Sequence, residues 1–293
     1  MRYTIENDML RVEVDSFGAE IKSVYDKQSG TEFMWQGDKK FWGRTSPVLF
    51  PFVGSLKNKE FIWKGEKYPM GQHGFARDME HSLFMQTSDE IWFTLISNQE
   101  TYAKYPFVFV LNIGYKLEGN TVKVMWKVSN TGEDTMYFSI GAHPAFNCPQ
   151  AGDDDKYGYS LYFGDVAEIH HHGNDVPTGM ALREDIVLPL TESKALITPG
   201  FFDRCTYMIE GKQTGEVGLV NKQGKRYVTL RFDMPLFAIW SPEGKDAPFV
   251  CIEPWCGRCD AEDFAGELQD REYTNVLEPG AVFENGYMME FTE

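Results

Sequence analysis

The sequence contains no apolar run near the roughly 18 residues that a membrane-spanning helix needs. Its first residues, from Met1 to Asp8, have no apolar signal core and already carry acidic side chains. Since a secretion signal combines a basic start with an apolar stretch, we expect no membrane association and a cytoplasmic protein. Cysteine is scarce, and its odd number, 5 in 293 residues, favours free thiols in a reducing compartment.

Basic residues are also few relative to acidic ones. The chain has 28 Lys and Arg against 44 Asp and Glu, which gives a formal net charge of −16. Such a field repels nucleic acids and anionic membranes, so neither is an expected partner. It also weighs weakly against a phosphorylated substrate, although a local arginine cluster would override that effect.

Several sequence motifs are missing. The chain has no G-x-x-x-x-G-K-[ST], G-x-G-x-x-G or G-x-S-x-G segment, so nucleotide binding and serine hydrolysis have no support. A single C-x-x-C spacing, Cys256 to Cys259, has no second pair to complete a zinc site. It also lacks the βαβ setting of a redox motif, and we interpret these thiols as structural.

Alternation of apolar and polar residues dominates what is present. It predicts half-buried strands at residues 9–15, 19–24, 121–128 and 227–232. Only residues 100–105 and 260–267 are expected to form short helical segments, the second with Asp260 as N-cap. Many short strands with few helices indicate an all-β protein, a large antiparallel β-sandwich or barrel. Because no linker interrupts the pattern, we predict a single domain over residues 1–293.

Three segments place ionisable residues among Gly, Pro and aromatic residues. The first contains Arg44 and, further on, His73 and Arg77; the second contains His143 before a proline; the third contains Glu253 in an apolar stretch. Histidine exchanges protons near neutral pH, and a buried carboxylate is a candidate general base. The alternatives are structural hydrogen bonds in the first segment, a core histidine at His143 and a solvent-facing glutamate at Glu253.

Two histidines and one carboxylate also suit a metal triad. Neither His73 nor His143 has a second ligand at the close spacing of H-x-H or H-E-x-x-H, which argues against this interpretation. The run from His170 to His172 lies in a polar stretch, 170–178, that we expect to be a solvated surface loop. We therefore predict neither a metal nor a cofactor.

In combination, these motifs resemble the aldose 1-epimerase (galactose mutarotase) superfamily, most closely its LacX-like branch. The resemblance extends over nearly the whole chain. The matching segments, in family order, are Trp42-Gly43-Arg44 with Pro47-Val48-Leu49-Phe50-Pro51, Gly71-Gln72-His73-Gly74-Phe75-Ala76-Arg77, Gly141-Ala142-His143-Pro144-Ala145-Phe146 and Cys251-Ile252-Glu253-Pro254-Trp255.

The resemblance implies a galactose mutarotase-like β-sandwich with an open cleft on one concave sheet. It implies Glu253 as general base, His143 as general acid, and His73 and Arg44 as groups that bind and polarise a sugar. The family also has an aspartate that contacts sugar hydroxyls, for which Asp203 is the nearest candidate. Arg77 belongs to the motif and either binds substrate or pairs with Asp78 or another acid.

The expected partner is thus a small sugar that stacks on aromatic side chains, and the protein is expected to be a monomer or a homodimer. Galactose mutarotases carry Asn directly before the histidine that corresponds to His143. This chain has Ala142 at that position, and Pro144 follows His143. Galactose specificity is therefore not expected. The alternatives are a hexose-6-phosphate 1-epimerase, a carbohydrate-binding protein without catalysis, and a metal-dependent β-sandwich enzyme.

Overall fold

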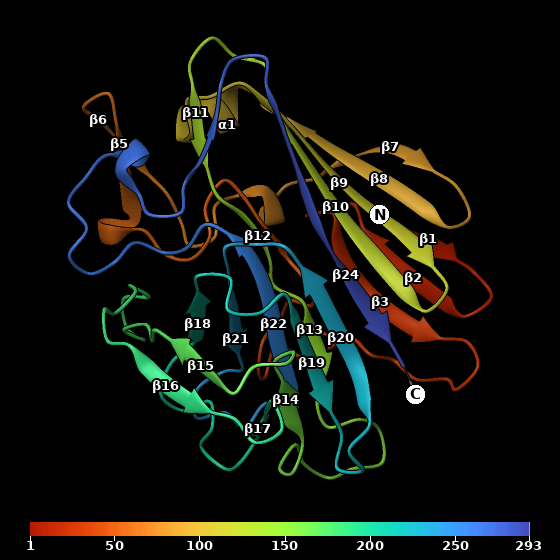
Figure 1. Cartoon of the computed structure of the whole chain (residues 1–293). Helices are drawn as coiled ribbons and strands as arrows, with labels where there is room; N and C mark the ends of the chain where they lie inside the picture. Colours follow the sequence, from red (N-terminus) through yellow and green to blue (C-terminus); the bar gives the residue numbers. More distant parts are fainter. Residues whose placement is uncertain (293) are drawn as a thin grey trace.

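Two large antiparallel sheets form the body of the protein in the computed structural model, which describes residues 1–292 (Figure 1). The nine-stranded sheet has the order β17-β14-β19-β20-β24-β10-β9-β8-β7. In that order its strands are Lys194–Leu196, Ser160–Tyr162, Glu216–Val220, Arg226–Phe232, Val282–Phe291, Thr121–Asn130, Phe109–Glu118, Glu90–Ile96 and Ser82–Gln86.

The second large sheet has the order β18-β21-β22-β12-β4, and β13 also pairs with β22. These strands are Tyr207–Glu210, Leu236–Trp240, Phe249–Cys256, Ile140–Ala142, Val48–Leu49 and Ala145–Asn147. Strand β22 lies inside this sheet and is buried along its whole length. The solvent-facing edge position that the sequence left open for Glu253 is therefore excluded.

Smaller sheets flank these two. A three-stranded sheet consists of β1 (Arg2–Glu6), β2 (Leu10–Asp15) and β3 (Glu20–Asp26), beside strands β8 to β10 in Figure 1. The two-stranded pairs are β5 with β6, β11 with β23 and β15 with β16. Their ranges are Glu60–Trp63, Glu66–Pro69, Met136–Phe138, Asn275–Leu277, Glu168–His171 and Ile186–Pro189.

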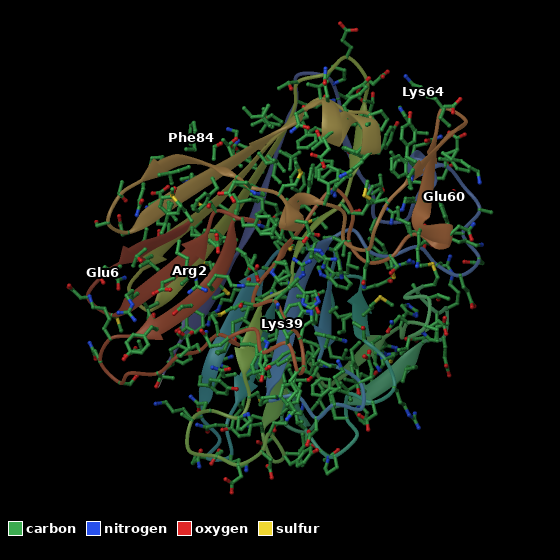
Figure 2. The ribbon with its side chains drawn as sticks, turned by 180° about the vertical axis from the view of Figure 1, so that it is seen from behind. Arg2, Glu6, Lys39, Glu60, Lys64 and Phe84 are labelled. Carbon is green, nitrogen blue, oxygen red and sulfur yellow. The ribbon has the colours of Figure 1, made fainter. Side chains whose placement is uncertain are left out.

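Seen from behind, the β5–β6 hairpin with Glu60 and Lys64 lies on one side of the molecule (Figure 2). Phe84, on the edge strand β7, lies on the other side. Within residues 1–292, no helix has the length and apolar character that crossing a membrane would require.

Helical structure is confined to short segments. Helix α1, Gln99–Lys104, confirms the expectation for residues 100–105 to within one residue, and Asn98 caps it. Three 3₁₀ turns, Lys57–Lys59, Ala76–Asp78 and Leu268–Asp270, complete the helical content of the described chain.

The expected helical turn at residues 260–267 is wrong. The Asp260 carboxylate accepts hydrogen bonds from Arg271 Nε at 2.6 Å and from the backbone N–H of Lys57 at 2.9 Å. Because those contacts occupy the carboxylate, Asp260 does not cap a helix. The four strands read from sequence alternation are confirmed as β2, β3, β10 and β20.

A buried tyrosine hydroxyl joins the three-stranded sheet to the nine-stranded one. Tyr115 of β9 is 2 % exposed, and its hydroxyl donates to the carbonyl oxygen of Ala19 at 2.6 Å. The Tyr115→Phe variant leaves that carbonyl unpaired, so we expect a loss of about 1–2 kcal/mol in unfolding free energy, measured by urea denaturation. Tyr102→Phe, at a half-exposed position on α1, is the control and should change nothing measurable. Equal stability of the Tyr115→Phe variant and the wild type would contradict this assignment.

Candidate functional site

A cavity of about 660 Å³ lies over the second large sheet. Its lining comes from segments far apart in the chain and from strands β18, β21 and β22. These residues are Trp42, Gly54, Ser55, Leu56, Lys59, Met70, Gly71, Gln72, His73, Arg77, His143, Asn174, Val176, Pro177, Thr178, Gly179, Thr206, Met208, Trp240, Glu243, Glu253, Trp255 and Cys259. Four of the six sequence-predicted site residues thus line one cavity: His73, Arg77, His143 and Glu253.

The alternation of side chains along β22 places the Glu253 carboxyl group on the cavity side of the sheet. Side chains two residues apart on a strand share a face, so Cys251, Glu253 and Trp255 lie on the cavity side of the sheet. Val250 and Ile252, on the other face, belong to the main hydrophobic core. Hydrophobic packing on one face therefore fixes the register that directs Glu253 toward the cavity.

His143 reaches the same place from the end of β12. Its backbone N–H donates to the carbonyl of Pro47 at 3.2 Å, and Pro144 follows it. Next to it in this sheet, Gly141 lies under the Trp255 indole, where a Cβ would come within 2.6 Å of that ring. Glycine leaves the space that the Trp255 side chain occupies there.

The catalytic candidates form a close pair. His143 Nε2 lies 3.3 Å from Glu253 Oε2, and the two residues are 7 % and 1 % exposed. The imidazole stacks on Trp42 with centroids 4.7 Å apart and meets Trp240 edge-on at 5.3 Å. The two indoles thus hold the ring in one orientation beside the carboxyl group.

Burial acts on both members of this pair in favour of their neutral forms. It raises the pKa of Glu253 well above 4.5, against a smaller opposite effect of Trp255. Burial, followed by the positive charge of Arg77, lowers the pKa of His143 to about 3. The free protein therefore favours a carboxylic acid beside a neutral imidazole, with one proton between the two groups.

His73 lies on a strained turn. Its φ of 66° is in the left-handed region, which costs a non-glycine residue roughly 1–2 kcal/mol. Two bonds to Gly54 hold it: the His73 N–H donates to the Gly54 carbonyl at 2.9 Å, and the Gly54 N–H donates to His73 Nδ1 at 3.0 Å. Because Nδ1 accepts, the ring proton is on Nε2.

The charge of His73 agrees with this tautomer. Burial, then the charge of Arg77, lowers its pKa well below 6.5, so the ring is neutral at physiological pH. Its centroid lies 5.6 Å from that of His143. His73 thus borders the catalytic candidates as a neutral N–H donor.

The two arginines differ in position. Arg77 lines the cavity and donates from Nη2 to the Gln72 carbonyl at 2.8 Å, with Nε 3.7 Å from Asp78. Arg44 forms a 2.7 Å ion pair with the same Asp78 and is not among the lining residues. Both guanidinium groups lie near enough to bias the two histidines toward neutrality.

Asp203 lies elsewhere. Its carboxylate accepts from the Gly244 N–H at 3.1 Å and borders a separate hollow of about 120 Å³. The carboxylate that does line the main cavity is Glu243, which accepts from Trp240 Nε1 at 3.3 Å. The sequence did not point to Glu243 or Trp240, because no motif marks the end of β21, where Trp240 lies, or the turn after it that carries Glu243.

The cysteines match the expected free thiols, whereas the histidine run differs from its expectation. All five cysteines are free and buried, and Cys259 lines the cavity. The stretch 170–178 is not wholly a solvated loop, because strand β15 includes His170 and His171, and His171 is 4 % exposed. Its ring packs against Tyr207, with centroids 4.5 Å apart, and this apolar contact removes it from solvent.

Comparisons with known proteins give a consistent result. The model of the aldose 1-epimerase family matches residues 1–285. The chain is 30% identical over 286 residues to the plasmid-encoded protein LacX of Lactococcus lactis, covering 94% of this chain and 95% of that one. A galactose mutarotase related enzyme from Lactobacillus acidophilus superposes with TM-score 0.93 at 35% identity, covering 100% and 98%. A galactose mutarotase-like protein from Lactobacillus casei superposes with TM-score 0.90 at 28% identity, and the match covers 100% of each chain.

The buried carboxyl group predicts a pH-dependent stability. A raised folded-state pKa gives stability that is fully present below the unfolded value near 4.5 and is lost as pH rises through the folded value. Glu253→Gln removes this loss. Between about pH 5 and about pH 8, we expect the stability of the variant relative to wild type to increase by about 1 kcal/mol or more, measured by urea unfolding.

Glu262→Gln, at an exposed glutamate, is the matched control and should follow the wild type at every pH. A difference between Glu253→Gln and wild type that stays constant with pH would show that the carboxyl group titrates normally.

Proposed function

Because the chain belongs to the aldose 1-epimerase family, we propose that it interconverts the α and β anomers of a sugar by acid–base ring opening and closure. The observation that carries the proposal is the buried His143–Glu253 pair, 3.3 Å apart on the wall of a cavity of about 660 Å³. Such a cavity suits a small molecule, since ligand pockets measure roughly 300–1,000 Å³.

The reaction needs one proton removed and one delivered. Glu253 takes the proton of the C1 hydroxyl, and His143 protonates the ring oxygen as the bond between C1 and the ring oxygen breaks. The open-chain aldehyde rotates about its C1–C2 bond. The hydroxyl formed from the ring oxygen then attacks the other face of the aldehyde, while the proton transfers at Glu253 and His143 run in reverse. Each acid–base group is expected to contribute roughly 10²–10⁴ in rate.

Burial favours this proton exchange in one direction. The Glu253–His143 pair has two protonation forms of equal total charge. One is carboxylate with imidazolium, the other is carboxylic acid with imidazole, and ring opening converts the first into the second. Because desolvation favours neutral groups, the raised pKa of Glu253 and the lowered pKa of His143 both favour the state after proton transfer. Because the free protein already favours the carboxylic acid with imidazole, the proton passes from Glu253 to His143 before ring opening, and ring opening then restores the neutral pair.

The surrounding groups suit a polyhydroxylated ring. Trp42, Trp240 and Trp255 offer apolar faces for the sugar's C–H groups. His73, whose proton is on Nε2, and Arg77 supply donors, whereas Glu243 supplies an acceptor. Arg44 then acts through Asp78 and the local field rather than by direct contact.

An unphosphorylated sugar fits the charges better than a hexose 6-phosphate. A phosphate dianion is usually met by several cations, often in bidentate contacts. Among the lining residues only Lys59 and Arg77 are cationic, and Arg77 is bonded to Gln72 beside Asp78. Glu243 adds a negative charge on the same wall.

The central test follows anomer exchange by polarimetry or NMR on freshly dissolved aldoses. We expect wild type to accelerate equilibration, and Glu253→Gln and His143→Gln each to lose about 10²-fold or more in kcat/KM. Glu262→Gln, at an exposed glutamate, should retain wild-type activity. A wild type that binds sugars without faster exchange would instead favour a carbohydrate-binding protein, and equal rates for wild type and Glu253→Gln would exclude Glu253 as base.

The same assay decides the substrate class. We expect kcat/KM for free aldoses to exceed that for the corresponding hexose 6-phosphates by about tenfold or more, because only two cations line the cavity. The measurement compares glucose and galactose with their 6-phosphates at equal ionic strength. A preference for the phosphates would overturn the assignment to neutral sugars and restore the phosphosugar alternative.

A further inference from the structure

Cys251 is a third ligand-type residue beside the catalytic candidates. It is two residues before Glu253 on β22, so the two side chains share a face. Cys251, Glu253 and His143 are 0 %, 1 % and 7 % exposed. We propose that these three residues form a binding site for one thiophilic divalent cation of the zinc class, in which the ion displaces protons from the Cys251 thiol and the Glu253 carboxyl group.

The geometry is close to that of a metal site with three protein ligands. One ligand atom from each residue lies within 4.8 Å of the other two, and His143 Nε2 is 3.3 Å from Glu253 Oε2. With metal–ligand distances of roughly 2.0–2.3 Å, tetrahedral geometry separates ligand atoms by about 3.3–3.7 Å. The largest of the three separations thus has to shrink by about 1 Å, within reach of side-chain rotation.

An unsatisfied polar atom lies at this place. Within the described chain, His143 Nδ1 is buried without a hydrogen-bond partner, and Glu253 Oε2 is buried with His143 Nε2 3.3 Å away as its contact. Leaving a buried polar atom unpaired costs about 1–3 kcal/mol. A cation held by Glu253 Oε2 and a ring nitrogen of His143 would take the place of the shared proton, and the cavity that both residues line offers its fourth position to water or substrate.

The donor set favours a thiophilic ion over magnesium or calcium. Thiolate and imidazole select zinc-like ions, whereas hard cations take oxygen ligands. Binding converts M²⁺, a thiol and a carboxylic acid into a neutral M²⁺–thiolate–carboxylate–imidazole unit and releases two protons to solvent. The neutral product limits repulsion from the nearby guanidinium groups of Arg77 and Arg44, which bias His143.

The ion would occupy the atoms that the proposed function uses for proton transfer. It therefore predicts reversible inhibition, a consequence that rests on the proposed function, whereas binding itself does not. Two competing sites need control. His170 and His172 are exposed enough to bind metal through nitrogen alone, and Cys259 is another thiol at the cavity, with Sγ 3.8 Å from Met208 Sδ.

The experiment titrates cadmium chloride into the full-length protein with His170 and His172 replaced by alanine, and records the ultraviolet cadmium–thiolate charge-transfer band. We expect one band that saturates at one ion per chain, and that persists in Cys259→Ser. Cys251→Ser should lose the band, with cadmium affinity reduced more than the about 10–100-fold that loss of an outer partner of a metal ligand causes. His143→Gln, a second variant with an intact thiol, should weaken binding while a band remains at high cadmium.

Three results would overturn the site: no band in the parent protein, a band that survives in Cys251→Ser with near-ultraviolet circular dichroism like that of the parent, or a band lost in Cys259→Ser instead. If the band behaves as expected but the protein shows no anomerase activity, the site stands and the proposed function fails. If activity is present and cadmium binds without inhibiting it, the ion is not held by the catalytic pair, and this proposal is wrong.

Discussion

The desolvation of one carboxyl group beside one imidazole is the constraint on which the candidate site depends. Glu253 is 1 % exposed in the middle of a fully buried strand, and His143 lies 3.3 Å away. A charged group in such a place is costly unless it is paired or neutral. The site resolves this by sharing one proton between two groups whose pKa values burial shifts toward neutrality.

The rest of the fold maintains that pair. One face of β22 packs into the core between the large sheets, which fixes the face from which Glu253 projects. Trp42 and Trp240 hold the imidazole, and Gly141 leaves room for Trp255. Around the opening, the strained turn at His73 is tied to Gly54 by two hydrogen bonds. Strand β22 thus carries Glu253, His143 directly follows β12, and loops carry most of the remaining lining.

The chain belongs to the aldose 1-epimerase family, and its likeness to LacX and to a mutarotase-related structure extends over nearly its whole length. The choice of sugar depends instead on the side chains that contact its hydroxyl groups, and these come from segments far apart in the chain. Glu243 and Asn174 belong to segments outside all four motifs, yet they line the same cavity as Glu253. The Cys251 thiol is buried on the same face of β22 as Glu253, behind the residues that line this cavity.

The sequence alone determined the strand-rich architecture, since alternation with period two follows directly from the geometry of a half-buried strand. The resemblance of four short motifs to one family also predicted His73, His143 and Glu253 as site residues, and the structure places these three along one cavity. Prediction from the sequence failed where the outcome depended on partners distant in the chain. Asp260 became a partner of Arg271 and Lys57 instead of a helix cap, and Arg44 paired with Asp78. Only the tertiary structure placed Glu243 in the cavity and Asp203 outside it, because loop positions follow from packing across the sheets rather than from local pattern.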